Sequence, residues 1–359
     1  MRRFATAWLL AVVACAGDPP PDVAALLGPP PDVGAAAPVP AAAAAKPLNL
    51  NEINPRLLRR FRAIVAPVPA SPAEVAQIAL GKQLFSEKRL SLHRDVACAT
   101  CHPLDHGGTD HLPTARDVHG APHKRNAPTV YNAAGNIAQQ WDGRARSLED
   151  QARLPLLNPD EMAMGRPEAV TAALRAIPAY APAFAAAFPS DPAAIDFDHA
   201  ITAIAAFERT LVTPARWDRF LSGDRTALSA AELDGMKLFA DVGCVQCHTG
   251  VLVGGSMFQR VGVARPWPNQ DDLGRFTITH DGNDRMVFKV PSLRNIAITS
   301  PYFHDGGTAS LSEAVKMMAR YQLDTELTDD EVTSIVAWLG ALTGEPPPGV
   351  LIPPVLPPG

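Results

Sequence analysis

The chain has few cysteines, little net charge and weak strand patterns. Five cysteines occur in 359 residues, and the formal net charge is −5, which disfavours nucleic-acid binding. No alternation of strands and helices accompanies the paired cysteines, which disfavours a thioredoxin-like redox dithiol. The apolar run at residues 5–14 is too short to span a bilayer stably. The paired cysteines therefore need another explanation.

Four of the five cysteines fall in two copies of one pentapeptide, Cys-x-x-Cys-His. This pattern is the attachment signal of c-type haem, in which both thiols bond to the porphyrin and the adjacent imidazole ligates the iron. A four-cysteine zinc site is the alternative, but it leaves both histidines unexplained. We therefore expect two covalently bound haem c groups. Their attachment residues are Cys98, Cys101 and His102 in the first copy, and Cys244, Cys247 and His248 in the second.

The N-terminus has the features of a targeting segment. Arg2 and Arg3 precede the apolar run, as in a signal peptide. Val12-Val-Ala-Cys15 resembles a lipobox, in which Cys15 is lipidated after cleavage; an ordinary signal peptide cut nearby is the alternative. We expect residues 1–15 to direct export to the periplasm, with a lipid anchor if Cys15 is modified.

The fold class predicted for the rest of the chain is mostly α, with two cytochrome-c-like haem domains joined by long loops. Residues 16–48 are rich in Pro and Ala and cannot form a packed core, so they predict an extended tether. Residues 49–222 and 223–346 would each form a domain around one haem motif. Residues 347–359 form a Pro-rich, non-helical tail.

Short polar residues predict where the helices begin. The first helix should end near Leu84 and the last at Gly344. Residues 275–279 and 286–290 predict a small hairpin. The expected N-cap residues are Ser71, Asp198, Ser229, Ser310 and Thr328.

Several longer motifs occur in order between about Ala79 and Pro346. They include Arg-Asn-Ala-Pro-Thr-Val-Tyr-Asn at 125–132, Trp-Asp-Gly-Arg at 141–144, Glu-Met at 161–162, Pro-Ser-Leu-Arg-Asn at 291–295 and Pro-Tyr-Phe-His-Asp-Gly at 301–306. Together with the haem motifs they resemble the bacterial di-haem cytochrome c peroxidases and the related MauG-type oxidases. The resemblance implies an enzyme that reduces hydrogen peroxide to water with electrons from a small cytochrome c or cupredoxin. A MauG-like oxidase of a protein side chain and a non-catalytic di-haem electron carrier are the alternatives.

The resemblance also implies roles for single residues. Met318 would be the second iron ligand of the C-terminal haem, where the MauG branch has a tyrosine. Trp141 would lie between the haems, and Glu161 would be the carboxylate of the N-terminal haem pocket, with Gln151 lining that pocket. Peroxide cleavage needs one group that removes a proton and returns it, and a buried carboxylate can do both.

Two further features follow from the resemblance. His119 would cap the N-terminal iron in the oxidised enzyme, but it lies one residue closer to the Arg-Asn motif than in the family, so His123 remains the alternative. Asn126 and the backbone carbonyls of Thr299 and Pro301 match a calcium site, and oxygen ligands suit Ca²⁺. Family members are commonly dimers.

Overall fold

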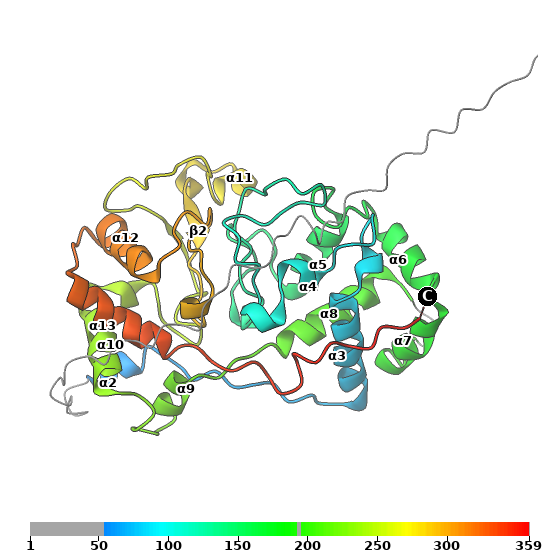
Figure 1. Ribbon diagram of the computed structural model, residues 1–359, viewed down its shortest axis with the longest axis horizontal. Coiled ribbons are helices and arrows are strands. Elements are labelled where there is room, and N and C mark those ends of the chain that lie inside the picture. The colour runs from blue at the N-terminus through cyan, green and yellow to red at the C-terminus, as the bar shows by residue number, and fades with distance from the viewer. Residues whose placement is uncertain (1–53, 192–194, 359) are drawn as a thin grey trace, which may run out of the picture. The chain divides into compact units, whose positions relative to one another are not determined.

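The computed structural model describes residues 54–191 and 195–358 (Figure 1). The predicted signal segment, Cys15 and the whole tether (residues 16–48) lie outside these residues. The described part is mostly helical, as predicted, and its strands are β1 (Phe258–Arg260) and β2 (Val287–Lys289). They pair antiparallel, with Phe258 opposite Lys289.

The α-helices and 3₁₀ helices are short and joined by long loops. The α-helices are α2 (Pro55–Leu58), α3 (Pro72–Phe85), α4 (Cys98–Cys101), α5 (Leu148–Leu157), α6 (Pro167–Arg175), α7 (Ala181–Ala187), α8 (Phe197–Arg209), α9 (Arg216–Leu221), α10 (Ala230–Val242), α11 (Phe276–Thr279), α12 (Leu311–Leu323) and α13 (Asp329–Gly340). The 3₁₀ helices are η2 (Lys88–Leu90), η3 (Leu104–His106), η4 (Ala133–Gly135), η5 (Pro178–Tyr180), η6 (Cys244–Gln246), η7 (Gly282–Asp284) and η8 (Ile296–Ile298).

Two apolar cores are each built around a tightly crossed helix pair. α3 packs on α8 in the first core, and α10 packs on α13 in the second. A glycine stands at each crossing: a side chain on Gly81 would collide with the carbonyl oxygen of Ala203, and one on Gly235 would collide with that of Ser334. The absence of a side chain lets the backbones approach closely, so each pair forms a rigid base beside one haem motif.

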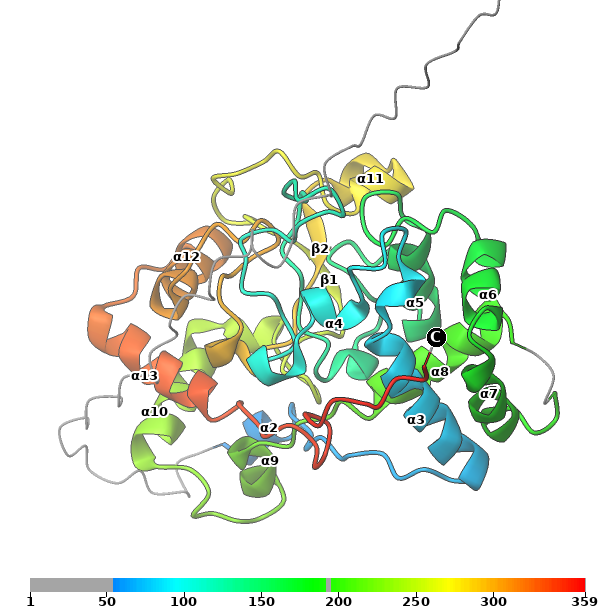
Figure 2. The same ribbon diagram turned by 45° about the vertical axis from the view of Figure 1, so that its right-hand side comes forward.

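Both ends of the described chain cross from one core to the other. Phe61, just after α2, is buried in the second core against Trp217 and Trp338. The Pro-rich tail is non-helical, as predicted, and runs beside α3 in both views (Figures 1 and 2). Lys82 Nζ donates to Gly349 O at 2.8 Å, and Gln83 Nε2 donates to Val355 O at 3.0 Å. The tail therefore packs against the first core.

The structure confirms four of the five predicted helix starts, because Ser71, Ser229, Ser310 and Thr328 are N-caps. Asp198 was the wrong residue. The N-cap of α8 is Asp196, whose side chain accepts from His199 N at 2.8 Å. Asp198 lies in the first turn and instead pairs with Arg153.

Two other local predictions were wrong. The last helix, α13, ends at Gly340 and not at Gly344. Gly344 lies in the loop after the helix, where its N–H donates to Asn295 Oδ1. Residues 276–279 form helix α11, and β2 takes its partner from β1, earlier in the chain. Alternation along a short strand does not specify its partner, which is set by tertiary packing.

No single helix of the described residues is long and apolar enough to cross a membrane. One pair of helical segments, Pro167–Arg175 and Pro178–Ala187, has the length and composition of a membrane span when taken together, but it is bent by 92°.

Candidate haem centres

The first cysteine motif forms the short helix α4 and the loop after it. Both thiols are free, and burial raises their pKa values, that of Cys101 to about 12. His102 Nδ1 lies 3.1 Å from the carbonyl oxygen of Gly108. A histidine whose Nδ1 donates to a carbonyl presents its other nitrogen, Nε2, as a ligand. The geometry therefore suits a covalently attached haem.

The second motif repeats this arrangement. Cys244 and Cys247 are free, and burial raises the pKa of Cys244 to about 12. His248 Nδ1 lies 3.1 Å from Val253 O, and burial lowers the pKa of His248 to about 4. Among the described residues no three His, Cys, Asp or Glu gather as a metal site. The two cysteine pairs therefore lie apart, and the residues fit two haems rather than one four-cysteine zinc site.

Glu161 faces the first motif. It lies in the turn after α5, where Asn158 Nδ2 donates to its Oε1 at 3.1 Å. Burial raises the pKa of Glu161, and His123 and Asn158 oppose the shift. Its charge in turn raises the pKa values of Cys98 and Cys101. Without the family motif, a glutamate after an Asn-Pro-Asp turn would pass for a surface residue.

The two histidine candidates occupy different surroundings. His119 is exposed, with its ring 6.4 Å from that of His93. His123 is half-buried, its Nε2 lies 3.2 Å from Asp160 O, and its charge acts on Glu161. The structure thus brings His123, rather than His119, beside Glu161.

Gln151 lies on α5 and is half-buried. Pro155 is one turn later on the same face of that helix, and Asn158 follows in the turn. The buried residues of α5, among them Ala152 and Leu156, occupy another face and pack in the first core. Gln151 is therefore on the side of α5 that leads toward Glu161.

Trp141 is held by hydrogen bonds to two other segments of the chain. Its Nε1 donates to Asn126 O at 2.9 Å, and its own carbonyl accepts from Lys289 N at 2.8 Å. The ring is half-buried against a cluster that includes Trp267, Phe288 and Met318. Trp141 thus joins the segment that follows the first haem motif to the cluster beside α12.

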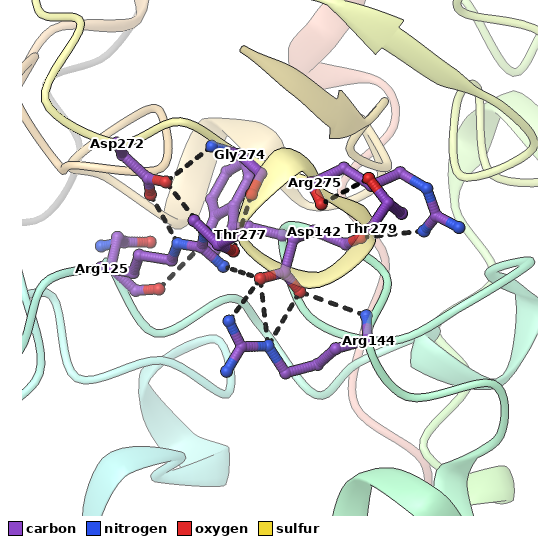
Figure 3. Close-up of polar contacts among 10 residues, drawn as sticks. Arg125, Asp142, Arg144, Asp272, Gly274, Arg275, Thr277 and Thr279 are labelled. Carbon is purple, nitrogen blue, oxygen red and sulfur yellow. Dashed lines mark hydrogen bonds and ion pairs between the residues drawn. The ribbon is translucent and has the colours of Figure 1, made fainter. Parts of the chain in front are cut away.

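A network of charges fixes the residue next to Trp141 (Figure 3). Asp142 is fully buried and accepts from Arg125 Nη1 at 2.5 Å and from Arg144. Arg125 also donates two hydrogen bonds to the carboxylate of Asp272, from Nε to Oδ2 at 2.6 Å and from Nη2 to Oδ1 at 2.9 Å. Burial alone would raise the pKa of Asp142, but Arg144 and Arg125 hold it below its ordinary value.

Sequence reasoning did not single out Arg125, Asp142 or Asp272. Arg125 and Asp142 lie within the longer motifs at 125–132 and 141–144, and this position could have marked them as candidates. Nothing in the sequence marked Asp272, because its partner lies 147 residues away.

The methionines of α12 differ in what their sulfurs contact. Both Met317 and Met318 pack against the Trp267 cluster. Thr308 Oγ1 donates to Met317 Sδ at 3.3 Å. That bond occupies the Met317 sulfur and distinguishes it from Met318, the residue expected to bind iron.

Of the predicted calcium ligands, Asn126 contacts the loop that carries Thr299 and Pro301. Asn126 is buried, its N–H donates to His304 O at 2.8 Å, and its Nδ2 donates to Leu112 O at 2.9 Å. Thr299 and Pro301 lie on the same loop as His304, but the contact of Asn126 with this loop is through His304.

Several proteins of known family are similar to this chain over most of its length. The profile of the family described as di-haem cytochrome c peroxidase matches residues 75–226. The chain is 46% identical over 297 residues to the cytochrome c551 peroxidase of Nitrosomonas europaea, covering 82% of this chain and 87% of that protein. It is 40% identical over 298 residues to the cytochrome c551 peroxidase of Pseudomonas aeruginosa, covering 79% and 86%.

MauG proteins are also similar. The methylamine utilization protein MauG of Methylorubrum extorquens is 38% identical over 291 residues, covering 77% of this chain and 81% of that protein. Among solved structures, a MauG-like protein associated with microbial copper homeostasis matches with a TM-score of 0.67 at 30% identity, covering 80% and 95%. These matches confirm the resemblance read from the motifs. The chain belongs to the di-haem cytochrome c peroxidase family, and it is a haem-dependent oxidoreductase of the peroxidase class.

Proposed function

We propose that this enzyme reduces hydrogen peroxide to water in the periplasm, with electrons from a small cytochrome c or cupredoxin. Each peroxide would consume two electrons and two protons and give two waters. The observation that carries the proposal is the half-buried carboxyl of Glu161, whose charge acts on Cys98 and Cys101 of the first haem motif. An electron carrier would need no such proton-transfer group beside its iron.

The N-terminal domain, residues 49–222, would be the peroxidatic one. Haem attached at Cys98 and Cys101, with His102 as ligand, supplies the iron at which the O–O bond is cleaved. Glu161 takes the proton from one peroxide oxygen and delivers it to the other, so that water can leave. Because burial raises its pKa, this carboxyl is easily reprotonated. Gln151 lines the same pocket.

The C-terminal domain, residues 223–346, would store and pass on an electron. Its haem is attached at Cys244 and Cys247, with His248 and Met318 as the two iron ligands. A thioether ligand raises the potential of a haem. Trp141, held between the two halves, provides the path from this centre to the first.

Two regulatory features complete the proposal. His119, or His123 in its place, would be the second ligand of the N-terminal iron in the oxidised enzyme, and it would have to leave before peroxide could bind. Ca²⁺ at Asn126 and the carbonyls of Thr299 and Pro301 holds the loops around Trp141 in register. A homodimer and a lipid anchor at Cys15 belong to the same proposal and rest on the resemblance and the sequence.

A MauG-like oxidase of a protein side chain is the second candidate, because MauG of Methylorubrum extorquens is 38% identical to this chain. Met318 disfavours it, since the MauG branch has a tyrosine at that position. Turnover with a small electron donor would separate the two, because only the peroxidase needs that donor.

The test is Glu161→Gln, which keeps the size of the side chain but cannot carry the proton. We expect both haems to remain attached and peroxide turnover to fall by about 10²–10⁴-fold. The matched control is Glu168→Gln, at an exposed position on α6, which should leave turnover unchanged. Unchanged turnover in Glu161→Gln would remove the residue from the mechanism.

A further inference from the structure

Lys289 is a buried cation without an anionic partner. The residue is 7% exposed, and among the described residues no carboxylate pairs with its amino group. Lys289 Nζ donates a long hydrogen bond, of 3.4 Å, to Asn136 Oδ1. Burial lowers the pKa of Lys289 to about 8. Burying an ammonium is costly unless an anion neutralises it, so the mature protein should supply one.

The position of β2 indicates which anion. Phe288 stacks on His304 with ring centroids 4.3 Å apart and belongs to the cluster that includes Met318, the proposed second ligand of the C-terminal haem. Two residues after Lys289, the carbonyl of Pro291 touches Gly254, where an added side chain would lie 3.2 Å from His248 Nδ1. β2 and the residues just after it therefore connect the Met318 cluster to the surroundings of His248, and Lys289 lies between the two.

The side of Lys289 is fixed by the strand. Successive side chains of a strand point to opposite faces, so Lys289 points away from the face on which Phe288 stacks. Its amino group is directed toward Asn136, just after η4. Its own N–H donates to the carbonyl of Trp141 at 2.8 Å. Lys289 thus lies where β2 contacts the first half of the chain, at Asn136 and Trp141.

We propose that the ammonium group of Lys289 binds a propionate carboxylate of the C-terminal haem, on the edge that faces Trp141. The proposal rests on the attachment of haem at Cys244 and Cys247. The carboxylate neutralises the buried lysine, and the lysine fixes this edge of the haem beside the tryptophan. A positive charge near the iron favours the reduced form, so Lys289 also helps to keep the potential of this haem high.

The experiment is a spectroelectrochemical titration of both haems in the full mature protein. Lys289→Met removes the charge and keeps the length of the side chain, while Lys289→Arg keeps the charge. For Lys289→Met we expect the reduction equilibrium of the C-terminal haem to fall about tenfold, about 59 mV for one electron. The potential in Lys289→Arg should stay closer to wild type. Lys88→Met, at an exposed position on η2, is the control and should shift neither haem.

Resonance Raman spectra give a second readout, because the bending mode of a propionate moves when its ionic hydrogen bond is lost. An unchanged C-terminal potential and an unchanged propionate mode in Lys289→Met would overturn the proposal, as would a shift confined to the N-terminal haem. If Lys289→Met does not mature, Lys289→Gln provides the uncharged comparison. A protein without covalent haem would instead refute the proposed function, and the mass of the purified chain distinguishes the two failures.

Discussion

The indole Nε1 of Trp141 donates a hydrogen bond to the carbonyl oxygen of Asn126 at 2.9 Å. The N–H of Asn126 in turn donates to His304 O at 2.8 Å, and the His304 ring lies 6.4 Å from the Trp141 ring. Asn126 therefore connects the tryptophan to the loop that carries His304, in addition to the bond that Lys289 N donates to the Trp141 carbonyl. These bonds fix the orientation of the indole.

The charge network beside Trp141 should be important for stability. Asp142→Asn removes a fully buried charge and leaves Arg125 and Arg144 without their shared partner. Breaking a buried ion pair costs about 3–5 kcal/mol, and the lower end is expected because Arg125 keeps Asp272. Urea unfolding at neutral pH measures the loss. Asp271→Asn, at the exposed neighbour of Asp272, is the control and should change stability by less than about 0.5 kcal/mol.

The same network predicts a dependence on acid. The pKa of Asp142 is lower in the folded chain than its ordinary value of 3.8. Its stabilisation is therefore fully present above that value and is lost as the pH falls through the folded pKa. Unfolding measured between neutral and strongly acidic pH should show a smaller acid-induced loss in Asp142→Asn than in wild type. Equal losses would mean that the ion pairs contribute nothing.

Glu161 should show the opposite sign. Burial raises its folded pKa above the ordinary value of 4.5, so its contribution to stability is lost as the pH rises through the folded pKa. Glu161→Gln should therefore raise the melting temperature at neutral pH while lowering turnover by about 10²–10⁴-fold. In wild type, peroxide turnover should fall on the acid side as Glu161 becomes protonated, and a pH profile of kcat/KM would show this limb. An acid limb that persists in the residual activity of Glu161→Gln would belong to another group.

The two methionines of α12 offer a matched pair of variants. Met318→Leu should remove the thioether-to-iron charge-transfer band and lower the potential of one haem. Met317→Leu should leave the band unchanged and cost less than about 1.5 kcal/mol of stability, because Leu and Met have similar volumes. Optical spectra of the oxidised proteins decide between them. A band lost in Met317→Leu and kept in Met318→Leu would reverse the assignment.

The resting state can be tested with His119→Gly and His123→Gly. We expect His119→Gly to leave the N-terminal iron five-coordinate in the oxidised protein, so that peroxide reacts without prior reduction. EPR of the oxidised variants measures this as a high-spin signal. If only His123→Gly gives that signal, the half-buried histidine near Glu161 is the ligand.

Local features of the fold were predictable, whereas features set by distant contacts were not. A Ser or Thr N-cap with a glutamate three residues later specifies its own helix start, which is why Ser229 and Thr328 were correct. The choice between Asp196 and Asp198 depends on where the chain enters α8. The pairing of β2 with β1 joins residues about thirty positions apart, and no alternation near β2 marks that partner.

The candidate site divides in the same way. The cysteine motifs are local, so the attachment residues could be predicted directly from the sequence. The predictions for Glu161 and Met318 needed the longer family motifs. The burial of Lys289 and the ion pair of Arg125 with Asp272 form only when segments far apart in the sequence pack together. No local sequence pattern predicts either of them.

The most direct test of the account is a titration of the oxidised, mature protein with one electron equivalent of reductant, followed by peroxide, with absorption and EPR recorded at each step. We predict that the C-terminal haem reduces first, that the N-terminal iron then becomes high-spin, and that peroxide reoxidises the protein rapidly. Two irons that stay low-spin and unreactive after half-reduction would identify an electron carrier and contradict the account.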